Sequence, residues 1–121
     1  MPLCKKNTFI VIKKCKNIYA LTHSMCEDIL NIYSSFGNID SVSLRLSNGY
    51  GFPELKSCDC WWLVINDLCK KYVKTNKIVI NSDGSAFRNF IHIDDVSRFV
   101  NILLKRNSKG FNLYNLSSND T

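Results

Sequence analysis

Hydrophobic residues recur along the chain at two spacings, which predict helices and strands. Between Ala20 and Phe36, the apolar residues follow at intervals of three and four, and they are Leu21, Met25, Ile29, Ile32 and Phe36. This spacing predicts a helix with one apolar face that ends at Gly37. From Ser41 to Leu46, apolar and polar residues alternate, which predicts a strand with one buried side.

The second half of the chain continues this alternation of helices and strands. We expect a loop at 47–53, a helix at about 59–74, strands at 77–80 and 89–93, a helix at 96–105 and a last strand at 111–116. Asp83 and Gly84 form a turn between the middle strands, and Asp94 or Asp95 is expected to cap the third helix. With no internal repeat or linker, the pattern predicts one continuous α/β unit.

Length and composition limit the size and class of the protein. A chain of 121 residues forms one small domain or part of one. Its apolar fraction of 45% and aromatic fraction of 12% are those of a globular chain, because disordered segments collect too little apolar surface to offset chain entropy. We expect the chain to fold.

Charge and cysteine content change this picture little. The net charge of +6 leaves nucleic-acid binding as an alternative, but the lysines form no helical stripe and no RNA-binding aromatic motif accompanies them. The apolar run 9–12 is too short for an export signal or a membrane span, so we expect a cytoplasmic protein with reduced thiols. The six cysteines have no zinc-site spacing, and we expect no metal. We therefore expect neither a nucleic acid nor a membrane as partner.

Candidate chemistry appears at three places. Tyr19, His23 and Glu27 are spaced by four, which places them along one side of the first helix. The strand that ends at Leu46 leads into a polar, glycine-containing loop, the kind of place where open α/β sheets bind ligands. Arg88 is the one arginine in an otherwise uncharged run, and its planar fork matches two phosphate oxygens.

These segments, taken together and in order, resemble a known family. Tyr-x-x-x at 19–22, Arg-x-x-Asn-x-Tyr-Gly at 45–51 and Asp-Gly-x-x-x-Arg at 83–88, followed by Phe-Ile-His-x-Asp-Asp-Val at 90–96, resemble the extended short-chain dehydrogenase/reductases. The resemblance covers about residues 19 to 118 and is to the NAD-dependent epimerases and dehydratases of nucleotide sugars. It implies a partial Rossmann-like α/β fold, with a basic leader at 1–18 and the substrate-binding C-terminal part at 19–121.

The resemblance also implies roles for individual residues. Tyr19 matches the catalytic tyrosine, which exchanges a proton with the sugar while hydride passes to or from the cofactor. Asn48 matches an asparagine that contacts the nucleotide sugar, Arg88 matches an arginine that binds its diphosphate, and Tyr50 is expected at the same substrate site. His92 is expected to pack rather than to react.

The chain departs from the family pattern in two ways. The family's lysine, four residues after the tyrosine, is His23 here, and we expect a histidine to activate Tyr19 less. No glycine-rich dinucleotide fingerprint is present, although the resemblance implies NAD(P) as cofactor. Only eighteen residues precede Tyr19, whereas the family has its cofactor-binding units there, so we expect a truncated enzyme. The resemblance implies a role in surface-polysaccharide synthesis.

We expect such an enzyme to be inactive alone and to depend on a separate N-terminal half. The helix at 20–36 resembles one that commonly forms a dimer face in the family, so a homodimer is a further expectation. The main alternative is a non-catalytic remnant or a nucleotide-sugar-binding module. The sugar, the nucleotide and the reaction outcome stay open at this point.

Overall fold

The computed structural model describes residues 3–6, 15–37, 39–55 and 57–118. Its elements in chain order are β1 (Leu3–Lys6), α1 (Ile18–Ser35), β2 (Ser41–Leu46), β3 (Asn48–Tyr50), α2 (Val64–Thr75), β4 (Phe90–His92), α3 (Ile93–Leu104) and β5 (Phe111–Ser117). Helices and strands alternate through most of this order. The expected α/β class is therefore confirmed.

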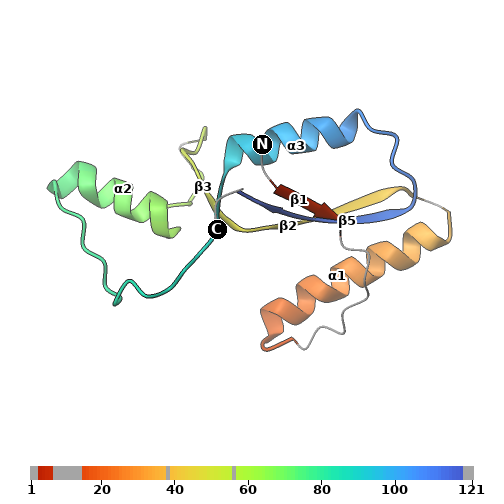
Figure 1. Cartoon of the computed structure of the whole chain (residues 1–121), viewed down its shortest axis with the longest axis horizontal. Helices are drawn as coiled ribbons and strands as arrows, with labels where there is room; N and C mark the ends of the chain where they lie inside the picture. The colour runs from red at the N-terminus through yellow and green to blue at the C-terminus, as the bar shows by residue number, and fades with distance from the viewer. Residues whose placement is uncertain (1–2, 7–14, 38, 56, 119–121) are drawn as a thin grey trace.

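Two small sheets organise the described residues. In the first sheet, β5 lies between β1, which is antiparallel to it, and β2, which is parallel to it over six residue pairs from Ser41–Phe111 to Leu46–Leu116. The second sheet is the parallel pair of β3 and β4. Figure 1 shows α3 along one face of the first sheet and α1 along the other, while α2 lies beyond the end of that sheet.

A small apolar core forms between the first sheet and α3. Ile91 of β4 and Leu116 of β5 are each 1% exposed, and Val96 of α3 packs with them. Phe99 of α3 meets Tyr114 of β5 edge to face, with ring centroids 5.6 Å apart. Alternate residues of β5 are buried, as expected for a strand whose one face is covered by a helix.

On the opposite face, α1 contacts the sheet through polar side chains. Ser34 and Ser41 share a hydrogen bond of 2.6 Å between their hydroxyl oxygens, and Glu27 pairs with Arg45 of β2. The apolar row of this helix points elsewhere, because Leu21, Met25, Ile29, Ile32 and Phe36 are all between 47% and 68% exposed. The predicted helix with one apolar face is confirmed, and this apolar face lies away from the sheet.

Several predicted boundaries differ from the structure. The expected loop after β2 contains β3, whose pairing with β4 is a long-range contact that no local pattern shows. The second helix begins at Val64, five residues later than predicted, and the expected strand at 77–80 is wrong because that segment is exposed and unpaired among the described residues. In the expected leader, residues 3–6 form β1, whereas 7–14 lie outside the described residues.

The expected cap of α3 is also wrong. His92 is the N-cap, and its ring nitrogen Nδ1 accepts a hydrogen bond of 3.2 Å from the Asp94 backbone N–H. Asp94 and Asp95 instead lie in the first turn, where their charge is favourable beside the helix dipole. The reason is that β4 runs directly into α3, so the last strand residue occupies the capping position. None of the described helices is both long and apolar enough to cross a membrane.

Asp40 joins the starts of the two parallel strands and makes the fold sensitive to acid. Its carboxylate accepts hydrogen bonds from the Gly110 backbone N–H at 2.7 Å and from Lys109 Nζ at 3.1 Å. The hydrogen bond from Gly110, and then that from Lys109, lower the pKa of Asp40. A lowered pKa in the folded state stabilises the fold above the ordinary aspartate pKa of about 3.9, and this stabilisation disappears as the pH falls through the folded value.

We therefore predict that Asp40→Asn lowers the free energy of unfolding at pH 7. The difference from the original chain should shrink steadily as urea titrations are repeated from pH 5 down to pH 3. Glu54→Gln serves as the control, because Glu54 is exposed and makes no ion pair with a described residue. A difference that is constant over this pH range would contradict the assignment.

Candidate functional site

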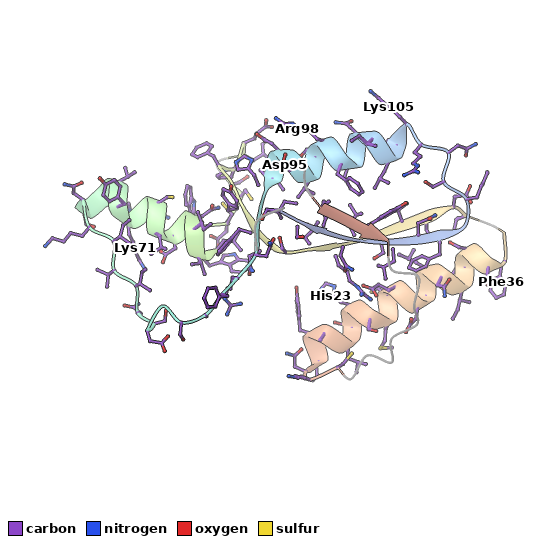
Figure 2. All side chains as sticks on the ribbon, viewed as in Figure 1. His23, Phe36, Lys71, Asp95, Arg98 and Lys105 are labelled. Atoms are coloured by element: carbon purple, nitrogen blue, oxygen red, sulfur yellow. The ribbon has the colours of Figure 1, made fainter. Side chains whose placement is uncertain are left out.

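A cleft of about 980 Å³ lies between the N-terminal half of α1 and the C-terminal half of β2, and we call it the α1 cleft. From the helix, Tyr19, His23 and Glu27 line it, and from β2 and the residue that follows, Arg45 and Ser47 line it. Figure 2 shows His23 on the side of α1 that faces the sheet. The interval of four residues therefore does place the three helix side chains along one cleft.

Tyr19 and His23 form the more open part of the α1 cleft. Their rings meet edge to face with centroids 4.4 Å apart, and Tyr19 is 74% exposed. The side chain of Asn17 caps this end of α1 by accepting from the Ala20 backbone N–H at 2.8 Å. The cap holds the first turn, and with it Tyr19, at the edge of the cleft.

Glu27 and Arg45 form the deeper part of the α1 cleft. Arg45 Nε donates to Glu27 Oε1 at 2.7 Å, and Arg45 Nη2 donates to Glu27 Oε2 at 2.6 Å. Burial raises the pKa of the Glu27 carboxyl, the charge of Asp28 adds to this increase, and His23 opposes it. Burial also lowers the pKa of Arg45. Because the paired hydrogen bonds stabilise both charges, we treat the pair as ionised at neutral pH and as a structural link between α1 and β2.

A second, smaller hollow of about 140 Å³ lies beyond the end of β2, and we call it the β3 hollow. It lies between β3, the start of α2 and the start of β4, and its lining residues are Asn48, Gly49, Trp62, Leu63, Val64 and Phe90. The N-cap of α2 is Leu63, which offers no side-chain hydrogen bond to the first turn. An uncapped helix N-terminus offers backbone N–H groups and a partial positive charge to an anion, and the carboxylate of Asp67 in the same first turn, paired with Lys71, partly offsets this charge.

Asn48 and Arg88 lie near each other but are held differently. Asn48 binds the Asn89 carbonyl twice, from its backbone N–H at 3.1 Å and from its side-chain Nδ2 at 2.9 Å. Arg88, the residue before Asn89, is exposed and makes no hydrogen bond or ion pair with any described residue. Its guanidinium is therefore available to a ligand.

Tyr50 and His92 pack together at the far end of β3. The Tyr50 ring meets the rings of Phe90 at 6.5 Å and of His92 at 5.0 Å, both edge to face. His92 is half-buried and caps α3, which agrees with the expectation that it packs. Tyr50 is half-buried as well and does not line either hollow, so its expected role at the substrate site stays a prediction.

The structure groups the predicted residues into two places rather than one. Tyr19 and His23 line the α1 cleft, Asn48 lines the β3 hollow, and Arg88 lines neither. No described residue lines both hollows, although Ser47 lines the first and Asn48, the next residue, lines the second.

Sequence reasoning missed Asn66, the buried asparagine of α2. It is 6% exposed, and its side-chain amide bonds to both the N–H and the carbonyl of Gly51. The available signal was a polar residue between Ile65 and Leu68 on the half-buried side of the predicted helix. The sequence also did not predict the pairing of Glu27 with Arg45, although Glu27 belongs to the Tyr19, His23 and Glu27 series and Arg45 begins the Arg-x-x-Asn-x-Tyr-Gly segment.

The described residues provide no cradle for the pyrophosphate of a dinucleotide. Such a cradle needs glycines between a strand and a helix N-terminus, whereas β4 enters α3 with no glycine and places Asp94 and Asp95 at the helix start. A pyrophosphate there would meet like charges. No three described residues of the types His, Cys, Asp and Glu form a group that could hold a metal ion.

Comparison with known proteins gives one result that decides the family. The model of the NAD dependent epimerase/dehydratase family matches residues 6–117. The chain matched no curated protein and no solved structure. The family match begins ahead of Tyr19 and runs to the last residue of β5, so it includes every element that lines the α1 cleft and the β3 hollow. The chain belongs to the NAD dependent epimerase/dehydratase family.

Proposed function

We propose that the chain is the substrate-binding, Rossmann-like C-terminal part of a nucleotide-sugar epimerase or dehydratase. In this proposal the sugar lies in the α1 cleft beside Tyr19, and the diphosphate lies at the β3 hollow. The observation that carries the proposal is that consecutive residues, Ser47 and Asn48, line the two hollows within a member of this family. A nucleoside diphosphate sugar has these two chemically different parts one bond apart.

The β3 hollow is proposed for the diphosphate because the N-terminus of α2, with its partial positive charge, forms one wall. The free N–H groups at the start of α2 face an anion favourably, and Asn48 lies on the opposite wall. Arg88 adds a full positive charge and a planar pair of donors from the neighbouring segment. Lys70 of α2 is not part of this hollow, because its Nζ lies over the Trp61 ring, 4.7 Å from the ring centroid.

The α1 cleft suits the sugar because Tyr19 presents an exposed phenol at its edge. In the proposed reaction Tyr19 exchanges a proton with a sugar hydroxyl, while His23, in contact with its ring, stands where the family has a lysine. The NAD(P) cofactor of the family supplies the hydride acceptor when it is bound. Because its pyrophosphate has no cradle among the described residues, we propose that a separate N-terminal half holds it.

A second candidate function is a nucleotide-sugar-binding module without catalysis. The missing pyrophosphate cradle favours it, since binding at the β3 hollow needs no cofactor. Either way, we propose that the chain acts in the cytoplasm on precursors of surface polysaccharide. Free thiols support this location, and the structure has them at Cys15, Cys26, Cys58, Cys60 and Cys69.

Binding of a nucleotide sugar tests the part that both functions share. We predict that UDP-glucose binds the chain in a calorimetric titration and that Arg88→Ala weakens its affinity about tenfold, the effect of losing one charge-assisted contact. Arg106→Ala is the matched control, because it removes the same charge from an exposed position after α3. Equal heats for the original chain and Arg88→Ala would remove Arg88 from the site.

Turnover separates the enzyme from the binding module. We predict that the chain converts the nucleotide sugar when NAD and a cofactor-binding partner chain are present. Product analysis measures this conversion. Tyr19→Phe should lower the rate by about 10²- to 10⁴-fold, the usual contribution of a proton-transfer group, while leaving the affinity unchanged. Tyr33→Phe, on the same helix but outside the α1 cleft, should keep the full rate. If the chain binds the nucleotide sugar but converts none of it with any partner chain, the enzyme is contradicted and the binding module is supported.

The exposed apolar row of α1 is proposed as the contact with a second copy of the chain. Its five side chains are roughly half exposed or more, and such continuous rows usually mark an interface. We predict that the sedimentation coefficient rises with protein concentration and that Ile29→Asp keeps the chain monomeric. A monomer at all concentrations would contradict the homodimer.

A further inference from the structure

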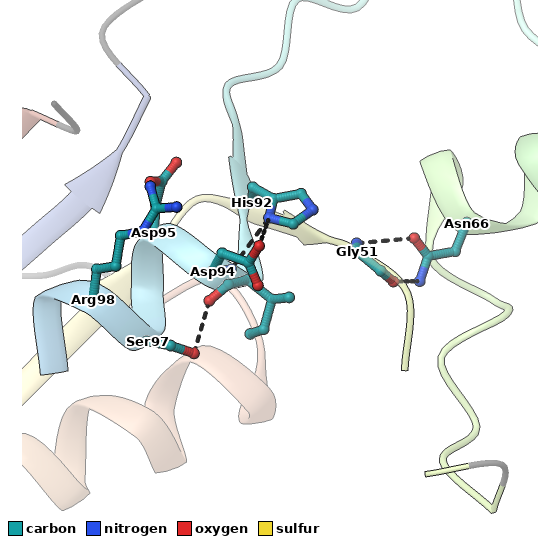
Figure 3. Close-up of polar contacts among 8 residues, drawn as sticks. Gly51, Asn66, His92, Asp94, Asp95, Ser97 and Arg98 are labelled. Carbon is teal, nitrogen blue, oxygen red and sulfur yellow. Dashed lines mark hydrogen bonds and ion pairs between the residues drawn. The ribbon is translucent and has the colours of Figure 1, made fainter. Parts of the chain in front are cut away.

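Asn66 joins two segments that are far apart in the sequence. Its Oδ1 accepts a hydrogen bond from the Gly51 N–H at 3.2 Å, and its Nδ2 donates to the Gly51 carbonyl at 3.0 Å and to the Cys60 carbonyl at 3.3 Å. Figure 3 shows the two bonds between Asn66 and Gly51 side by side. A buried amide that satisfies a backbone N–H and carbonyl together holds that peptide in one position.

The position of this clamp matters because it lies directly behind the β3 hollow. Asn66 is the third residue of α2, and the residues just before it, Leu63 and Val64, form one wall of the hollow. Gly51 directly follows β3, whose residues Asn48 and Gly49 form the opposite wall. The amide of Asn66 therefore fixes the distance between the two walls.

Gly51 is confined on its other side as well. A Cβ atom added there would lie 2.6 Å from Ile93 Cγ2 at the start of α3, and its φ of +149° disfavours any residue with a side chain. The Gly51 peptide thus lies between α2 and α3 with little room to move. Loss of the Asn66 hydrogen bonds releases the Gly51 peptide on the side of α2. A side chain added at Gly51 displaces the same peptide from the side of α3.

We infer that Asn66 is a positioning residue that sets the width of the β3 hollow and thereby its affinity for the diphosphate of a nucleotide sugar. The inference rests on the function proposed above, and it adds a residue that touches no ligand. Asn66 holds the Gly51 peptide at the end of β3. We infer that this keeps the β3 wall, which carries Asn48, opposite the start of α2, so that both walls reach the same phosphates. Without the clamp, the two walls separate and only one of them reaches the ligand at a time.

Both tryptophans of the chain stand beside this hollow, which makes its occupancy visible. Trp62 lines it, whereas the Trp61 ring packs against Phe52 and Lys70, so we assign to the hollow only an emission change that Trp62→Phe abolishes. We would titrate the chain with UDP-glucose and with inorganic pyrophosphate and follow the tryptophan emission. The variant is Asn66→Leu, which keeps the branched shape and the charge but cannot hydrogen-bond to Gly51.

Asn112→Leu is the matched control. Asn112 is also 6% exposed, and its side chain donates to the carbonyls of Lys109 and Gly110, at the start of β5 and away from both hollows. Both substitutions leave backbone groups unpaired and should lower the melting temperature. Only Asn66→Leu should raise the UDP-glucose concentration at which half of the change in tryptophan emission is reached, by about tenfold for one lost contact.

Gly51→Ala provides a second route if Asn66→Leu does not fold, and it should weaken binding in the same way. The inference is overturned if either folded variant binds UDP-glucose as tightly as the original chain. It is also overturned if Asn112→Leu weakens binding as much, because the effect is then general instability. If the original chain responds to neither UDP-glucose nor pyrophosphate, the proposed function fails first and the inference fails with it.

Discussion

The parallel pairing of β2 with β5 is the constraint on which the rest of the structure depends. Two parallel neighbours cannot be joined by a hairpin, so the chain must leave the sheet at the end of β2 and return to its opposite end. That crossover contains β3, α2, β4 and α3, which build the β3 hollow and cover one face of the sheet. The hydrogen bond from the Ser47 N–H to the Leu116 carbonyl marks the point of departure. Ser47 lines the α1 cleft, and the next residue, Asn48, lines the β3 hollow.

The two faces of the sheet are covered by different chemistry, and this difference shapes the site. α3 packs through apolar and aromatic side chains such as Val96 and Phe99, which close that face. α1 is held by the Ser34–Ser41 hydrogen bond and the Glu27–Arg45 ion pair, and an open cleft lies at its N-terminal end. Because these polar residues of α1 face the sheet, its apolar row is exposed. The polar contacts with the sheet and the apolar outer surface are thus two results of one helix orientation.

Function in this family requires a substrate, a proton-transfer group and a hydride acceptor at one place. The described residues place a tyrosine beside the α1 cleft, and they offer no cradle for the acceptor's pyrophosphate. Consecutive residues line the two hollows, and the buried amide of Asn66 binds Gly51 next to the β3 hollow. The proposed function assigns substrate binding to these hollows and the cofactor to a separate partner.

The sequence by itself determined the α/β class, the exact bounds of β2, and the placement of Tyr19, His23 and Glu27 along one side of α1. These features are local, because helical and strand periods are set by neighbouring residues. Only the tertiary structure decided that β3 pairs with β4, that His92 caps α3, that Asn66 holds Gly51, and that Tyr19 and Asn48 line separate hollows. Each of these depends on contacts between segments far apart in the chain, and the periodicity of one segment carries no information on what packs against it.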